Sequence, residues 1–129
     1  MVDIVLVSHS LKLVDGLKEL VLEMAPDVIV YAVGGTKEGE IGTDFDQILD
    51  TFQRVGEDGA IVLFDLGSSC MASQMAHEAL PAAQQSKIEI VDAPLVECSI
   101  EAAVLSSIGE TKSAIVEKLA KYKIGKMQD

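Results

Sequence analysis

Short apolar runs alternate with segments of helical periodicity along this chain. The runs span residues 3–8, 28–33, 60–64 and 88–91, and continuous apolar runs of this length are typical of strands covered on both faces. Between them, apolar residues recur at intervals of three and four, as in amphipathic helices. Four strands alternating with helices predict an α/β fold, in which right-handed βαβ units build a mainly parallel sheet.

Helix boundaries are also marked in the sequence. The first helix is expected to end just before Pro26, and Thr43 is placed to be the N-cap of the second. A third helix begins in the "DLGSS" segment and contains Met71 and Met75. An Ala-rich helix and a short amphipathic helix complete the chain. The apolar face expected of the first helix consists of Leu13, Leu17, Leu20, Val21 and Met24.

Polar and glycine residues gather where the predicted strands end. The carboxyl ends of parallel strands lie at one edge of the sheet, and ligands bind there, near a switch in strand order. The residues expected at this edge are Ser8, His9 and Ser10 after the first strand, Gly34, Gly35 and Thr36 after the second, Asp65, Gly67 and Ser68 after the third, and Ala93 and Pro94 after the fourth.

A histidine, a carboxylate and several glycine- and hydroxyl-rich loops at one edge favour phosphoryl transfer. A neutral imidazole is nucleophilic near pH 7, and one ring nitrogen can attack when the other carries the proton. Asp65 is the candidate to accept that N–H and orient His9. Loop N–H groups, hydroxyls and helix N-termini would hold the anionic group. These residues favour a relay through a phosphohistidine.

Other interpretations of the same residues compete. His9 could be a structural residue that caps its strand. A serine hydrolase would need a G-x-S-x-G elbow, which the sequence lacks. A receiver domain would need an acidic pair after the first strand, where this chain has Ser8 and His9. A flavin site would need aromatic walls, and only 4% of the residues are aromatic. The two histidines and two cysteines show no zinc-ligand spacing. His77, in the middle of a helix, is expected at the surface or in a subunit contact.

Composition narrows the class of protein further. A length of 129 residues suits one domain, and 49% hydrophobic with 24% charged residues is a globular composition. The net charge of -11 argues against nucleic-acid binding and fits cationic partner surfaces. No apolar run approaches the roughly 20 residues of a membrane helix. Cys70 and Cys98 are expected to be buried, reduced thiols of a cytoplasmic protein.

The motifs "VSHS", "IGTD", "FDLGSS" and "APLVE", in this order, resemble those of a known family. They are similar to the phosphotransferase subunits of PTS-dependent dihydroxyacetone kinases, which belong with the mannose-family enzyme IIA domains. The resemblance covers nearly the whole chain. "GTD", "DLGS" and the serine after His9 are more similar to the kinase subunits than to the mannose transporter domains.

This resemblance implies a site and a set of partners. His9 would take a phosphoryl group from the histidine phosphocarrier protein (HPr) of the phosphoenolpyruvate system and pass it to ADP in the kinase L subunit. The regenerated ATP would phosphorylate dihydroxyacetone. Asp65 would orient His9, and the phosphoryl site would be lined by Ser10, Gly67 and Ser68, with Thr43 at its edge. No metal or cofactor is implied on this chain, because Mg²⁺ would accompany the nucleotide on the L subunit.

The resemblance also implies a three-layer sandwich with helices on both faces of the sheet, a possible antiparallel edge strand, and a homodimer. Some relatives continue into further domains, whereas this chain is expected to be one enzyme IIA domain spanning residues 1–129. A relay residue must reach two proteins in turn, so a fairly flat face around His9, without a deep substrate pocket, is expected. A mannose-type sugar relay and a non-catalytic, anion-binding signalling domain remain alternatives.

Overall fold

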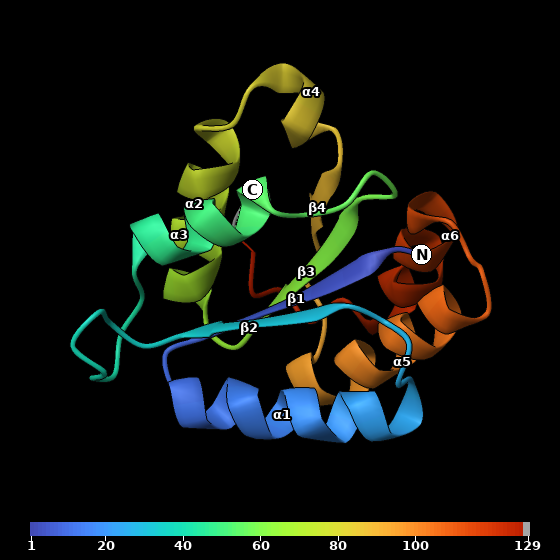
Figure 1. Cartoon of the computed structure of the whole chain (residues 1–129), viewed down its shortest axis with the longest axis horizontal. Coiled ribbons are helices and arrows are strands. Elements are labelled where there is room, and N and C mark those ends of the chain that lie inside the picture. Colours follow the sequence, from blue (N-terminus) through green and yellow to red (C-terminus); the bar gives the residue numbers. More distant parts are fainter. Residues whose placement is uncertain (128–129) are drawn as a thin grey trace.

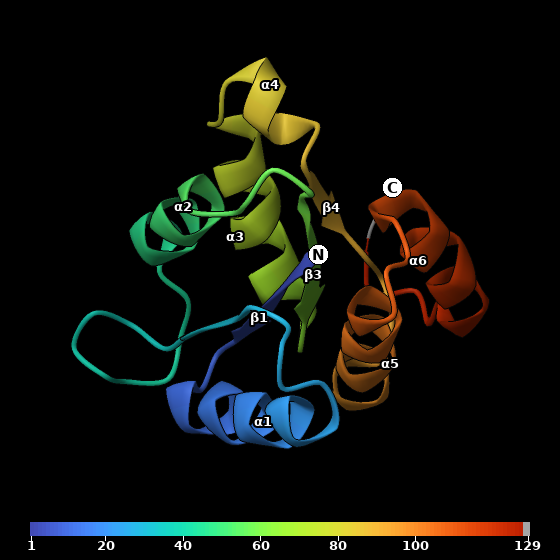
Figure 2. The ribbon, with the colours of Figure 1, turned by 45° about the vertical axis from the view of Figure 1, so that its right-hand side comes forward.

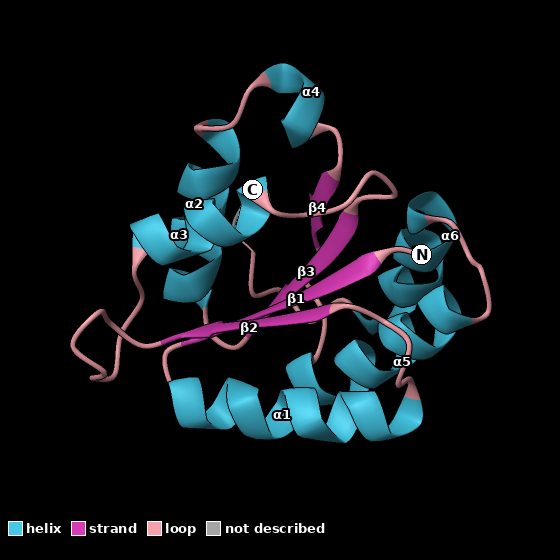
Figure 3. Ribbon diagram, in the orientation of Figure 1, coloured by secondary structure: helices cyan, strands magenta, loops and turns pink. Residues whose placement is uncertain are grey.

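The computed structural model describes residues 1–127, whose four strands form one sheet in the order β2-β1-β3-β4 (Figure 3). Every strand pair in this described part is parallel, so the α/β prediction is confirmed and the suggested antiparallel edge strand is absent from it. The predicted second strand begins two residues too early and the fourth ends one residue too late. The strands are β1 (Asp3–Ser8), β2 (Val30–Gly34), β3 (Ala60–Phe64) and β4 (Ile88–Ile90).

Helices cover both faces of the sheet and give the expected three layers (Figures 1 and 2). One face is covered by α1 (Leu11–Met24), α5 (Leu95–Ser107) and α6 (Lys112–Leu119). The other is covered by α2 (Phe45–Gln53) and α3 (Gly67–Glu78), which pack against each other. A short helix, α4 (Ala82–Gln85), precedes β4, and a 3-10 turn, η1 (Ala120–Tyr122), follows α6.

Strand β1 shows why these strands are apolar without interruption. Successive side chains of a strand point to opposite faces. Ile4 and Leu6 therefore pack in the core beneath α1 and α5, while Val5 and Val7 pack in the core beneath α2 and α3. All four are at most 1% exposed. With both faces covered by helices, the middle of the strand is apolar, and its two polar residues, Asp3 and Ser8, lie at the strand ends, where each has hydrogen-bond partners.

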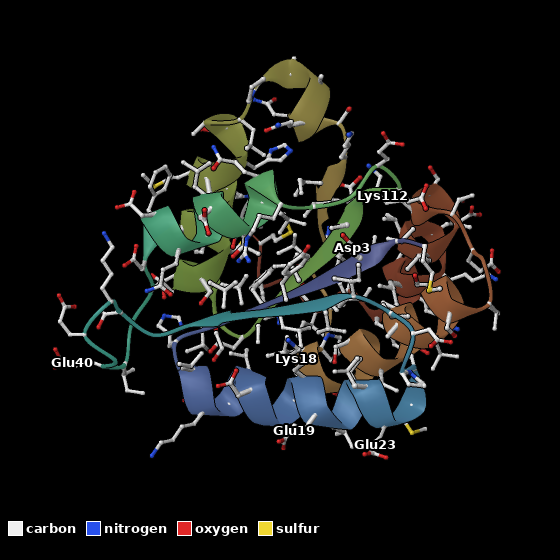
Figure 4. The ribbon with its side chains drawn as sticks, viewed as in Figure 1. Asp3, Lys18, Glu19, Glu23, Glu40 and Lys112 are labelled. Carbon is white, nitrogen blue, oxygen red and sulfur yellow. The ribbon has the colours of Figure 1, made fainter. Side chains whose placement is uncertain are left out.

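Helix α1 buries a face that matches the prediction only in part, because Leu17 and Val21 are buried as expected. Helix α1 buries Val14, Leu17 and Val21, whereas Leu13 and Leu20 are nearly half exposed. The buried residues follow one stripe at intervals of three and four, and the other leucines lie beside it. Figure 4 shows Glu19 and Glu23 of this helix pointing away from the sheet.

Helix α3 buries small residues instead of its methionines. Met71 and Met75 are 65% and 60% exposed, while the buried positions are Ser69, Cys70, Ser73 and Ala76. Small side chains allow the helix backbone to approach the sheet closely. The start of α3 is thereby held beside the carboxyl ends of the strands.

Strand order brings the two central chemical groups together. The chain passes from β1 to β2 on one side and then returns to β3 on the other, so the order switches between β1 and β3. Val7 of β1 is paired with Phe64 of β3, and the residues that follow each strand emerge side by side. This is the point at which open α/β sheets bind ligands.

Candidate active site

His9 lies between the end of β1 and the first turn of α1. Its backbone N–H donates to Asp65 Oδ2 at 3.0 Å, and its carbonyl oxygen accepts from Gly42 N–H at 2.9 Å. The next residue, Ser10, is the N-cap of α1, and its Oγ accepts from Leu13 N–H at 3.3 Å. The histidine backbone is therefore held by a strand, a helix cap and the loop that follows β2.

The imidazole ring of His9 has a different partner on each nitrogen. Nδ1 lies 3.1 Å from Asp65 Oδ1, and Nε2 lies 2.6 Å from Ser68 Oγ. A carboxylate can only accept, so Nδ1 carries the proton. The lone pair of Nε2 then accepts from the serine hydroxyl. This is the tautomer in which Nε2 can act as a nucleophile.

The carboxylate of Asp65 is held by a network of donors. Its partners include Ser8 Oγ at 2.8 Å, Ser69 Oγ at 2.8 Å and Leu66 N–H at 2.7 Å, in addition to the two groups of His9. Burial raises the pKa of Asp65, but these hydrogen bonds outweigh it and lower the pKa to about 2. The group is therefore an anion at neutral pH, able to stabilise a positive charge on the ring.

Two serines of this network were not assigned a role from the sequence. Ser8 is fully buried, and its hydroxyl donates to Asp65 and accepts from Ser10 N–H at 3.0 Å. Ser69 is also buried, and its Oγ lies 3.0 Å from His9 Nδ1. The sequence spacing could have identified Ser69, because it follows Asp65 by four residues, and side chains four residues apart at the start of a helix lie on the same side of it.

Gly67 and Ser68, both predicted to bind a phosphoryl group, lie in the first turn of α3. The N-cap of this helix, Leu66, makes no side-chain capping hydrogen bond. In the first turn, Ser69 N–H donates to the carbonyl oxygen of Leu66 at 3.0 Å, and the helix dipole favours an anion beside the N–H groups of Gly67 and Ser68. The structure thus brings the Ser68 hydroxyl, at the N-terminus of α3, to the nucleophilic side of His9.

Thr43 is not the N-cap that the sequence predicted. The cap is Asp44, whose Oδ1 accepts from Asp46 N–H at 2.9 Å and Gln47 N–H at 3.3 Å. Helix α2 begins one residue later than expected, because the carboxylate accepts both N–H groups. Among residues 1–127, no hydrogen bond joins Thr43 to His9, so its place at the edge of the phosphoryl site stays a prediction.

The face around the site is less flat than expected. The side chain of His9 is 20% exposed. Beside it lies a hollow of about 450 Å³, which His9 does not line. The C-terminal segment lies next to α3, and its Lys126 forms part of the wall of this hollow. The lining residues are Gly67, Ser68, Cys70, Met71, Gln74 and Lys126.

The side chains of His77, Cys70 and Cys98 are not among the hydrogen-bond partners of His9 or Asp65 in the described residues, although Cys70 lines the hollow. His77 Nε2 lies 2.9 Å from the carbonyl oxygen of Gln85, a contact that ties α3 to α4 within the chain. Cys70 and Cys98 are both buried and free, as predicted. Within residues 1–127, no cluster of three or more His, Cys, Asp or Glu side chains is arranged to hold a metal ion. None of the helices described has the length and apolar character needed to cross a bilayer.

Comparison with known proteins assigns the family. Residues 3–116 match the family described as the PTS system fructose IIA component, EIIA-man. The chain belongs to the EIIA-man family. Two relatives match this chain over nearly their whole length, and both are named DhaM subunits. One is "PEP-dependent dihydroxyacetone kinase 2, phosphoryl donor subunit DhaM" of Listeria innocua, 39% identical over 92% of this chain and 97% of that protein.

The other relative is "PTS-dependent dihydroxyacetone kinase, phosphotransferase subunit DhaM" of Lactococcus lactis, 37% identical over 95% of this chain and 97% of that protein. A solved crystal structure of the protein of unknown function EF1359 has a TM-score of 0.85 and 33% identity, and covers 93% of each chain. The resemblance to DhaM subunits found in the motifs is confirmed, and the EIIA-man fold is shared with a solved structure.

Proposed function

We propose that this EIIA-man protein is the phosphoryl-carrying subunit of a dihydroxyacetone kinase and works through a phosphohistidine at His9. The observation that supports this most directly is the geometry of the ring: Nδ1 faces the Asp65 carboxylate and Nε2 faces Ser68 at the start of α3. The names of the two full-length DhaM relatives support the kinase pathway.

In the first step, HPr would present its phosphohistidine to the exposed edge of the site. The Nε2 lone pair of His9 attacks phosphorus, and the donor N–P bond breaks with its electron pair left on the HPr imidazole. The proton on Nδ1 stays in place, so the His9 ring becomes cationic as the new N–P bond forms. The anionic Asp65 stabilises that charge.

In the second step, the phosphoryl group would pass to ADP bound in the L subunit. An oxygen of the terminal phosphate of ADP attacks phosphorus, and the electron pair of the N–P bond returns to Nε2. The first-turn N–H groups of α3 and the Ser68 hydroxyl stabilise the equatorial oxygens during both transfers. Mg²⁺ would belong with the nucleotide on the L subunit, and this chain would need no cofactor of its own.

The surface around the site supports docking of other proteins. Leu66 and Met71, on either side of Ser68, are 60% and 65% exposed. The net charge of -11 favours partners with cationic surfaces. We extend the proposal to HPr and the kinase L subunit as successive partners, and to a homodimer of this chain that leaves the His9 edge accessible.

Intact-mass measurement tests the relay. The protein is incubated with phosphoenolpyruvate, enzyme I and HPr, and compared with His9→Ala and with His77→Ala as the matched control. The wild type and His77→Ala should gain about 80 Da in an acid-labile form, and His9→Ala should gain nothing. No gain in the wild type, with active donor proteins, would refute the phosphohistidine and favour a non-catalytic anion-binding domain.

Adding the ADP-loaded L subunit tests the acceptor. The phosphoryl group should leave His9 and appear in ATP. If it stays on the protein with an active L subunit but moves to a sugar-transporter IIB component, the kinase pathway is wrong and the sugar relay is right.

A further inference from the structure

The C-terminal segment after η1 returns to the edge of the sheet that holds His9. It is anchored by Asp92, which follows β4 and is 8% exposed. Asp92 Oδ1 accepts from Ile124 N–H at 3.4 Å, and Oδ2 accepts from Met127 N–H at 3.2 Å. A buried carboxylate that accepts from several backbone N–H groups holds a turn in place, because leaving the carboxylate or the N–H groups without a hydrogen-bond partner costs free energy. The residues between these two donors are therefore held in place.

Lys126 lies in this anchored turn, and its ammonium reaches the end of β3. Nζ donates to the carbonyl oxygen of Phe64 at 2.7 Å and lies 4.6 Å from the centroid of the Phe64 ring. It is also 3.5 Å from the carbonyl oxygen of Asp65. A cation therefore sits against the backbone of the residue whose side chain orients His9.

One hollow is lined both by Lys126 and by the serine that faces His9 Nε2. Ser68 and Lys126 both line the hollow of about 450 Å³ beside α3. Ser68 Oγ lies 2.6 Å from His9 Nε2, so a group bonded to Nε2 points toward Ser68, one of the residues that line this hollow. The other ring nitrogen is covered by Asp65 and Ser69.

We propose that Lys126 is a phosphoryl-binding residue of the relay. Its ammonium donates to an oxygen of the phosphoryl group on His9 Nε2, while Asp92 keeps the segment in place. A lysine has three N–H donors, so it can hold the Phe64 carbonyl and a phosphoryl oxygen together. This assignment rests on the proposed function.

Charge-preserving and charge-removing variants test the role of Lys126. Single-turnover phosphorylation by phospho-HPr is measured for wild type, Lys126→Met, Lys126→Arg and the control Lys123→Met, which removes an exposed cation from the same segment. Lys126→Met should be slower by about tenfold or more, since an oxyanion donor is lost. Lys126→Arg should recover most of the rate, and Lys123→Met should match the wild type.

A structural role would give a different pattern. Asp92→Ala loosens the segment but keeps the ammonium, and thermal unfolding of each variant reports on packing. If Lys126→Met relays at the wild-type rate, the proposal is wrong. If Lys126→Met, Lys126→Arg and Asp92→Ala are equally slow and equally destabilised, the lysine only packs the segment, and the proposal is overturned.

Titration with inorganic phosphate separates this proposal from the relay itself. NMR signals of the His9 ring and of Lys126 should shift with added phosphate, and the dissociation constant should rise about tenfold in Lys126→Met. If the wild type shows this binding but is never phosphorylated, the relay is wrong and the anion contact stands. If it is phosphorylated but Lys126→Met binds phosphate equally well, the relay stands and Lys126 has no part in it.

Discussion

Replacing Asp65 with asparagine keeps the size of the side chain and removes its charge. The carboxylate accepts hydrogen bonds from the N–H groups of His9 and Leu66, the hydroxyls of Ser8 and Ser69, and His9 Nδ1. An amide has one acceptor oxygen, and its NH₂ group faces donors. At least one buried donor therefore loses its acceptor.

The cost in stability follows from the pKa of this group. The folded protein lowers the pKa of Asp65 from 3.8 to about 2. This shift corresponds to about 2 kcal/mol of stability at neutral pH, and an unpaired donor adds about 1–3 kcal/mol. We expect Asp65→Asn to lower the free energy of unfolding by about 3–5 kcal/mol at pH 7.

The same shift sets the pH dependence of the effect. Because the folded-state pKa is depressed, the charge of Asp65 stabilises the protein fully above pH 4, and this contribution is lost as the pH falls toward 2. The difference between wild type and Asp65→Asn, measured by urea unfolding, should narrow over that range. The control is Asp46→Asn, which removes an exposed carboxylate that pairs with Lys37 at 3.0 Å and should change stability little.

The substitution should also stop the chemistry. An amide NH₂ directed at Nδ1 donates to it, which moves the proton of His9 to Nε2 and removes the nucleophilic lone pair. Loss of an orienting carboxylate of this kind reduces rates by about 10⁴ in the serine protease triad, and we expect a fall of about 10³ or more in single-turnover phosphorylation. Nitrogen-15 NMR of the ring reads the tautomer directly. An unchanged tautomer, together with wild-type stability and rate, would refute this account of Asp65.

Three further predictions follow from the contacts of single residues. Ser69→Ala removes a buried hydroxyl that donates to Asp65 at 2.8 Å, and urea unfolding should show a loss of about 1 kcal/mol. Gly34→Ala would place a Cβ 2.8 Å from the carbonyl oxygen of Ser10, so the backbone next to His9 must shift and the free energy of unfolding should fall by about 1–3 kcal/mol; an unchanged melting temperature would contradict the clash. Burial raises the pKa of Cys98 to about 11, so its reaction with a thiol reagent at pH 8 should be at least about 100-fold slower in the native protein than in urea.

Local patterns along the chain were enough to predict the sheet and the centre of the site. Apolar runs mark strands, and in a parallel sheet the residue after each run lies at one edge. Those two facts place His9, Asp65 and Ser68 at the same edge, and the pairing of β1 with β3 in the structure brings them into contact. The family motifs lie at the same strand ends, so resemblance and topology pointed to the same residues.

Other features were decided by packing between distant parts of the chain. Periodicity says that α1 and α3 each have a buried face, but the docking of the helix on the sheet selects Val14 over Leu13 and Ser69 over Met71. The position of Lys126 depends on Asp92, which lies 34 residues earlier along the chain at the end of another strand.

The physical reason for this division is the range of the forces involved. Strand and helix formation depends on side chains within a few residues of one another, so a sequence window contains the signal. Some donors to the Asp65 carboxylate are close to it in sequence, such as Ser69, whereas Ser8 lies 57 residues away. Only the closed fold brings such groups within hydrogen-bonding distance. The sequence alone determined which residues line the edge of the sheet. The tertiary structure decided which ring nitrogen of His9 faces the carboxylate, the pKa of Asp65 and the place of the Lys126 ammonium at the end of β3.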